Sequence, residues 1–131
     1  MVQEISATAC AEALAQNPEA VLLDVRTAPE VQFVGAPTVA NWRHISLTLF
    51  PPTQPDPEFL PKVAAQIRPD QPIYCLCKVG GRSAAAAQML LSAGYSQVFN
   101  VSHGFDGAQN SERQRRSVNG WVAEGLPWAQ P

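Results

Sequence analysis

Apolar runs of strand length alternate along the chain with segments in which apolar and small residues recur at helical spacing. Residues 20–25, AVLLDV, and residues 71–77, QPIYCLC, are almost continuously apolar, which is typical of strands covered on both faces. Residues 97–101, QVFNV, predict another strand, and residues 41–47, NWRHISL, predict a weaker one. The pattern therefore indicates several short strands, most of them buried.

Helical segments lie between these strands. ATACAEALAQ, residues 7–16, follows Ser6, which is suited to cap a helix, and precedes Asn17 and Pro18, which are suited to end one. The spacing therefore predicts a helix over these ten residues.

Two more helices are expected in the second half of the chain. A proline-rich loop at residues 50–57 leads into a predicted helix over residues 58–67. RSAAAAQMLLSAG predicts a helix from Ser83, with Gly94 placed to cap its C-terminus. Strands that alternate with helices predict an α/β fold, with a mainly parallel central sheet, helices on both faces and one domain over residues 1–131.

Composition agrees with one soluble domain and narrows its partners. The 131 residues are 46% hydrophobic and 15% charged, so the chain can bury a core and is not of the disordered class. The net charge of −2 gives no reason to expect a nucleic-acid partner. No stretch approaches the roughly 18 apolar residues of a membrane span, and the N-terminus lacks a basic, apolar leader pattern. We therefore expect a cytoplasmic protein with no membrane partner.

The three cysteines do not form a metal site by their spacing. Cys75 and Cys77 form one C-x-C pair, and neither Cys10 nor a histidine supplies a second pair at zinc spacing. Cys10, on an alanine-rich helix, and Cys75, in mid-strand, are most simply interpreted as small buried hydrophobes. We expect no metal and no cofactor, and we leave open a redox role for Cys75.

Cys77 differs from the other two thiols because it stands where a buried strand ends and a helix begins. The carboxyl ends of parallel strands are where open α/β sheets place their sites. The segment CKVGGRS supplies successive backbone N–H groups and two glycines that can take the positive φ of a curled loop. The helix N-terminus and two cations add positive charge, so a thiol here is expected to ionise readily. The candidate site is Cys77 with the loop Lys78, Val79, Gly80, Gly81 and Arg82, followed by Ser83.

Asp24 and Arg26 follow the first buried strand and can therefore reach the same end of the sheet as Cys77. They are supporting candidates, although a purely structural interpretation is available, in which Arg26 pairs with Glu30 and Asp24 caps the turn. Arg82 also has a structural alternative, in which its guanidinium bonds inward to carbonyls of the loop.

Neither histidine forms an obvious catalytic triad with Cys77. His44 is interpreted as a surface or supporting residue, and His103, near the glycine-rich exit, is not assigned to the site.

Four separated pieces of the chain resemble the rhodanese-like sulfurtransferases, in that family's order. LLDVRTAPEVQFVG, residues 22–35, is similar to its first signature, and CKVGGRSAAAAQMLLSAGY to its active-site loop and following helix. VFNVSHGFDG resembles its last strand with a glycine-rich exit, and NGWVAEGLPW resembles its C-terminal Trp helix. The chain departs from the family at GAPTVANWRHISL, where a histidine and a glycine are absent or displaced, and at AQNSERQRRSV, which is inserted.

The resemblance implies that Cys77 is the nucleophile of a single-domain sulfurtransferase. The thiolate would take the outer sulfur of a donor such as thiosulfate, become a persulfide, and pass the sulfur to cyanide or a thiol. The partners implied are therefore a small sulfur donor and a thiophilic acceptor, while a protein partner stays unknown. Two alternatives remain: a non-catalytic rhodanese-like binding or redox-sensing module, and a cysteine phosphatase or arsenate reductase relative. The loop from Cys77 to Arg82 is one residue shorter than the Cys-x5-Arg loop of the latter.

The inserted segment, residues 108–118, predicts a solvated surface loop because it contains little apolar material. A sharper hypothesis is that Arg113, Arg115 and Arg116 form a mobile flap near the site and steer anionic donors.

Overall fold

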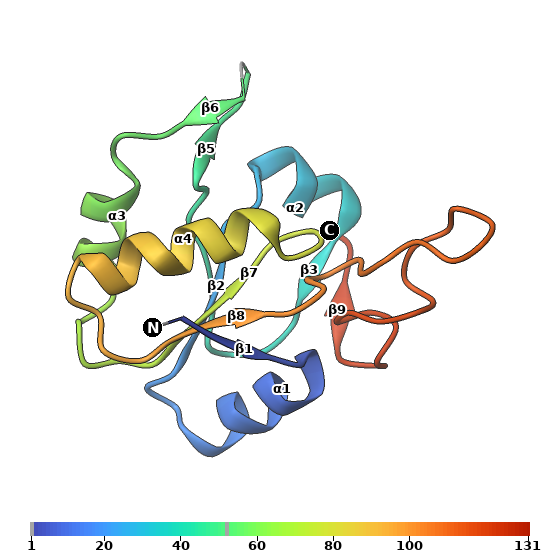
Figure 1. Ribbon diagram of the computed structural model, residues 1–131, viewed down its shortest axis with the longest axis horizontal. Coiled ribbons are helices and arrows are strands. Elements are labelled where there is room, and N and C mark those ends of the chain that lie inside the picture. Colours follow the sequence, from blue (N-terminus) through green and yellow to red (C-terminus); the bar gives the residue numbers. More distant parts are fainter. Residues whose placement is uncertain (1, 52) are drawn as a thin grey trace.

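A five-stranded sheet in which all neighbouring strands are parallel forms the centre of the molecule (Figure 1). The computed structural model describes residues 2–51 and 53–131. The strand order is β1-β8-β7-β2-β4. The strands are β1 (Gln3–Ile5), β2 (Val21–Asp24), β4 (Trp42–His44), β7 (Ile73–Leu76) and β8 (Val98–Val101). The predicted α/β class with a mainly parallel central sheet is confirmed.

The two most apolar runs occupy the middle of this sheet. β7 pairs with β2 on one side and with β8 on the other, and every residue of β2 and β7 is buried. A strand with neighbours on both edges and cover on both faces has no side facing water, so it needs no polar alternation. The sequence pattern therefore located the central strands correctly.

Helices cover both faces of the sheet, as predicted. The helices are α1 (Ala7–Gln16), α2 (Ala28–Val34), α3 (Phe59–Gln66) and α4 (Gly81–Ser92). One core cluster contains Phe59 and Val63 of α3 with Ala86 and Leu90 of α4. The other core cluster contains Cys10 and Leu14 of α1, together with residues from the C-terminal part of the chain. Figure 1 shows α1 on the opposite side of the sheet from α3 and α4.

Local signals set most helix ends where the sequence predicted them. The Ser6 hydroxyl accepts a hydrogen bond from the Ala9 N–H at the start of α1. Gly94 follows the C-cap Ala93 of α4 with a φ of +102°, a conformation that favours glycine. α4 begins at Gly81, two residues before the predicted start at Ser83.

Four parts of the chain differ from the sequence prediction. Helix α2 was not predicted, because it is short and none of its residues is buried. The edge strand β1 was not predicted, because three residues carry too short a pattern. The proline-rich segment includes one strand of a small hairpin, β5 (Thr48–Leu49) with β6 (Gln54–Pro55). The expected C-terminal Trp helix is absent from residues 117–127, which form turns and bends before β9 (Trp128–Ala129) pairs with β3 (Ala36–Pro37).

Candidate active site

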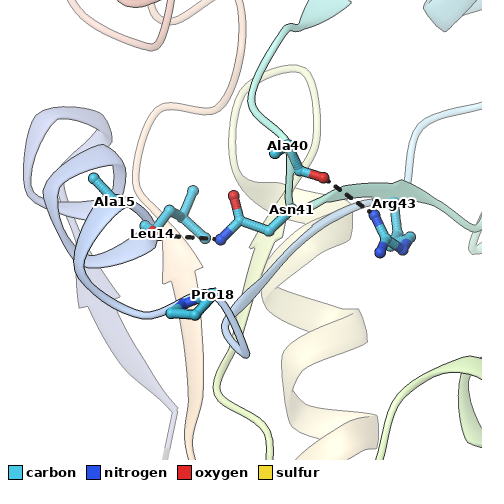
Figure 2. A pocket seen from close by; sticks show the side chains of 6 residues that line it. All are labelled: Leu14, Ala15, Pro18, Ala40, Asn41 and Arg43. Atoms are coloured by element: carbon cyan, nitrogen blue, oxygen red, sulfur yellow. Dashed lines mark hydrogen bonds between the residues drawn. The ribbon is translucent and has the colours of Figure 1, made fainter.

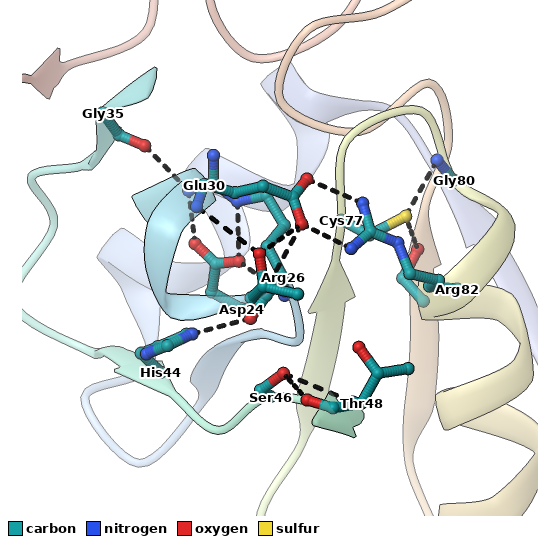
Figure 3. A network of polar contacts seen from close by, with 12 residues as sticks. Asp24, Arg26, Glu30, Gly35, His44, Ser46, Thr48, Cys77, Gly80 and Arg82 are labelled. Atoms are coloured by element: carbon teal, nitrogen blue, oxygen red, sulfur yellow. Dashed lines mark hydrogen bonds and ion pairs between the residues drawn. The ribbon is translucent and has the colours of Figure 1, made fainter. Parts of the chain in front are cut away.

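Cys77 lies immediately after β7 and before α4, at the carboxyl edge of the sheet. Its side chain is 1% exposed. The sulfur accepts a hydrogen bond from the Gly80 N–H at 3.1 Å, and the Ser83 hydroxyl oxygen lies 3.2 Å from it (Figure 3). The predicted grouping of Cys77 with the loop glycine and Ser83 is therefore present, and the loop curls over the sulfur.

Gly80 carries the curl of this loop. Its φ of +108° and ψ of −7° lie in the region that residues with a Cβ rarely adopt. The neighbouring Gly81 is the first residue of α4, has no positive φ, and would place an added Cβ in open space. The expectation that both glycines use positive φ is therefore wrong for Gly81, because the helix has already begun there.

The turn after β8 supports the loop from below. The Phe105 N–H donates to the Cys77 carbonyl at 2.8 Å, and the Asp106 N–H donates to the Lys78 carbonyl at 2.9 Å. A Cβ on Gly104 would stand 2.5 Å from the Cys77 carbonyl oxygen, so only glycine allows this approach. This role of Gly104 was not predicted, although the glycines of the HGFDG segment are a signal for it.

Arg82 is engaged in an ion pair that ties α4 to α2. Its guanidinium donates two hydrogen bonds to Glu30, at 2.6 and 2.8 Å (Figure 3). Glu30 also closes a capping box with Thr27 at the start of α2. Arg82 therefore does not bond inward to carbonyls of the loop. It is also not an unpaired cation, because the Glu30 carboxylate balances its charge.

The pKa of Glu30 depends on two opposing effects, its burial and its contacts with Arg82 and Thr27. Burial acts to raise the pKa of this carboxyl, but the hydrogen bonds and charge of Arg82, with those of Thr27, outweigh burial and lower the pKa to about 2. Glu30 is thus ionised at any pH near neutrality.

Asp24 and Arg26 form a buried ion pair beside this network, at 2.7 Å. Arg26 also donates to the Gly35 carbonyl at 2.9 Å, and its guanidinium lies 4.5 Å from the centre of the Phe105 ring. Asp24 accepts the Arg26 backbone N–H at 3.2 Å, as expected of a residue that caps the turn. The expected pairing of Arg26 with Glu30 is wrong, because Asp24 takes the fork of Arg26 and Arg82 takes Glu30.

The surroundings of the other two thiols, Cys10 and Cys75, indicate a structural role. Cys10 and Cys75 are both fully buried. Burial raises the pKa of Cys10 to about 12 and raises that of Cys75 strongly, with Cys77 and Cys10 adding to the effect at Cys75. Neither thiol is placed to ionise near neutral pH.

Lys78 and Val79 form the exposed top of the loop, and Val79 is 44% exposed. Within the described part of the chain, no hydrogen bond or ion pair engages the Lys78 ammonium group. His44 bonds through its Nε2 to the Arg26 carbonyl at 2.7 Å, which agrees with a supporting role. His103 is exposed at the loop's edge, with a φ of +71°.

The inserted segment 108–118 is exposed or partly exposed throughout, but two of its arginines are held. Arg116 forms an ion pair with Asp106 at 2.8 Å and lies over the Trp128 ring at 5.5 Å. Arg115 donates to the Gly107 carbonyl at 2.8 Å. The hypothesis of three arginines on a mobile flap is therefore reduced to Arg113.

A surface hollow of about 370 Å³ lies between α1 and the segment that leads into β4 (Figure 2). It is lined by Leu14, Ala15, Pro18, Ala40, Asn41 and Arg43. None of these residues belongs to the predicted site.

None of the helices within residues 2–51 and 53–131 has the length and apolar character needed to cross a membrane.

The parallel sheet, the loop around a cysteine and the chain's relatives define the class as a rhodanese-like domain. A solved structure, Rv0390 from M. tuberculosis, has a TM-score of 0.90 and 33% identity, covering 99% of this chain and 98% of its own. The polysulfide-sulfur transferase homodimer from Wolinella succinogenes has a TM-score of 0.72 and 25% identity, covering 99% of this chain and 80% of its own.

More narrowly, the chain belongs to the family described as the STR4 middle domain, whose model matches residues 3–131. The uncharacterised protein RP600 of Rickettsia prowazekii is 35% identical and covers 98% of both chains. A sulfurtransferase of Allochromatium vinosum is 25% identical and covers 100% of this chain and 98% of its own. The chain thus has a rhodanese-like fold and a distant sulfurtransferase relative.

Proposed function

We propose that this protein is a sulfurtransferase that carries a sulfane sulfur as a persulfide on Cys77. The observation that carries the proposal is the position of the sulfur, 3.1 Å from the Gly80 N–H, where the loop turns into α4. A helix N-terminus and a backbone donor both favour negative charge on sulfur, as thiolate and as persulfide. Similarity to a sulfurtransferase and to a polysulfide-sulfur transferase supports the same chemistry.

The reaction has two displacements. In the first, the Cys77 thiolate attacks the outer sulfur of thiosulfate, a new S–S bond forms, and sulfite leaves with the electron pair of the bond that breaks. In the second, cyanide or a thiolate attacks the outer sulfur of the persulfide, and the Cys77 thiolate leaves with the electron pair. No net oxidation of the protein occurs, and Cys77 returns to its starting state.

The charged groups around the site affect which sulfur donors it can attract. Arg82 is balanced by Glu30, so Lys78 is the exposed cation on the loop that an anionic donor meets. Thiosulfate and inorganic polysulfide are both small anions with a sulfur that can be transferred, and both belong in the test.

The test is the intact mass of the protein after treatment with thiosulfate or polysulfide and removal of the donor. We expect a gain of one sulfur atom that maps to Cys77, is lost on adding cyanide with release of thiocyanate, and does not occur in Cys77→Ser. Cys10→Ser is the matched control, because it removes a buried thiol from the other face of the sheet. A protein that gains no sulfur from either donor would instead support a non-catalytic binding module.

A further inference from the structure

A chain of polar contacts runs from the sulfur of Cys77, through Ser83 on α4 and Asn100 on β8, to Glu4 on the edge strand β1. Ser83 Oγ lies 3.2 Å from the sulfur and 2.5 Å from the Oδ1 of Asn100. The Nδ2 of Asn100 lies 3.1 Å from both carboxylate oxygens of Glu4 and 3.2 Å from the Gly80 carbonyl. Asn100 is 4% exposed, and β8 places it directly beside Glu4 of β1.

The acceptors around Asn100 fix which way its amide points. A carboxylate and a carbonyl only accept hydrogen bonds, so the atom facing Glu4 and the Gly80 carbonyl must be the amide nitrogen. The amide oxygen is therefore the atom that faces Ser83. Turning the amide over would set its oxygen against two groups of acceptors in a buried place, which costs more than the bonds it would gain.

This orientation decides what the Ser83 hydroxyl does. A hydroxyl has one proton to donate, and the short contact with the Asn100 Oδ1 takes it. Toward Cys77, Ser83 therefore offers a lone pair, which accepts the S–H of a neutral thiol but cannot stabilise a thiolate. A thiolate receives the Ser83 proton only when the O–H turns away from Asn100.

We propose that Asn100 is a positioning residue that sets how readily Cys77 ionises, by holding the proton of Ser83 away from the sulfur. When Cys77 loses its proton to solvent, the Ser83 O–H turns from the Asn100 oxygen to the sulfur, and the broken Ser83–Asn100 bond opposes ionisation. This role goes beyond the proposed function but rests on it for its biological meaning, since the sulfur transferred is the one on Cys77.

Other charged or titratable groups around Cys77 come from several elements. Asp24 is paired with Arg26, and Glu30 is paired with Arg82. The remaining groups are Cys75 on β7, Lys78 in the loop, Glu4 on β1 and His103 in the turn after β8. Of these groups Glu4 bonds to Asn100, and Asn100→Ala frees its carboxylate both with and without the Ser83 hydroxyl. A double-variant cycle therefore isolates the contact between Asn100 and Ser83.

The experiment is a titration of thiolate absorbance, with no sulfur donor present, in the parent protein, Asn100→Ala, Ser83→Ala and the double variant. Burial raises the pKa of Cys10 to about 12 and also raises that of Cys75, so neither of these thiols contributes thiolate absorbance near neutral pH. We expect Asn100→Ala to lower the midpoint by about 1 pH unit, the size of one hydrogen bond to a charged group. In the Ser83→Ala background, the same substitution should shift the midpoint by less than about 0.3 unit, within the usual error of additivity.

Two results would overturn the proposal: a midpoint that does not fall in Asn100→Ala, or an equal fall with and without the Ser83 hydroxyl. The second result would mean that Asn100 acts through the Gly80 carbonyl or through the general shape of the site. Thermal unfolding verifies that each variant is folded. If Asn100→Ala does not fold, Asn100→Leu replaces it, because leucine has a similar volume to asparagine and no hydrogen-bond acceptor. Because the titration contains no donor, a protein that fails to form a persulfide can still pass or fail this test.

Discussion

Replacement of Gly80 by alanine tests the idea that one strained backbone position holds the sulfur. A residue with a Cβ at a φ of +108° is expected to cost roughly 2 kcal/mol, since even the milder left-handed region costs 1–2 kcal/mol. Steric contact adds little, because the nearest atom to the new Cβ is the His103 nitrogen at 3.4 Å. The cost therefore comes from the backbone conformation.

The chain can meet this cost in two ways, and each is measurable. If residue 80 keeps its conformation, the free energy of unfolding falls by about 2 kcal/mol, which lowers the melting temperature by roughly 6–10 °C. If the peptide rotates to relieve the strain, its N–H leaves the Cys77 sulfur and the thiolate loses a charge-assisted hydrogen bond. The midpoint of iodoacetamide alkylation against pH then rises by about 1 unit.

Gly81→Ala is the matched control, one residue further along the same loop. Its position has helical backbone and open space, so alanine should stabilise the protein slightly, by about 0.5–1 kcal/mol, and leave the alkylation midpoint unchanged. Urea unfolding and the alkylation profile should be measured on both variants. Equal effects of the two substitutions, or none from either, would refute the assignment of the curl to Gly80.

Two further predictions concern ion pairs around the site. Because the pKa of Glu30 is lowered to about 2 in the folded protein from an unfolded value of about 4.3, its contribution to stability is complete above about pH 4.3 and is lost as pH falls toward 2. Glu30→Gln should therefore lower the free energy of unfolding at pH 6 by about 1–2 kcal/mol, a value discounted for the partial exposure of the pair with Arg82. It should also flatten the acid dependence of urea unfolding between pH 5 and about 2. An unchanged acid profile would contradict the pairing. Arg116→Ala should lower the free energy of unfolding by about 1 kcal/mol because it breaks the pair with Asp106, whereas the exposed Arg113→Ala should change it by less than about 0.5 kcal/mol. If thermal melts rank these two variants the other way, the inserted segment is not held as the contacts indicate.

Short-range patterns in the sequence were sufficient to place the central strands and Cys77. The runs AVLLDV and QPIYCLC are apolar because β2 and β7 lie inside the sheet, so the burial of these strands can be predicted directly from their composition. Cys77 followed from the same pattern, since the end of a parallel strand before a helix is a position that periodicity alone reveals. The curl of the loop was predicted from its glycines, but which glycine carries it depends on where α4 begins.

The partners of the polar side chains were decided only by the tertiary structure. Arg82 pairs with Glu30 across 52 residues, and Ser83 meets Asn100 across 17. Glu4 reaches Asn100 across 96 residues, because β1 is added beside β8 at the edge of the sheet. Strand order and register bring these groups together, and neither is written in a local pattern of the chain. A charged residue can satisfy its hydrogen bonds with any of several partners of opposite charge, so its choice is fixed by which elements pack side by side.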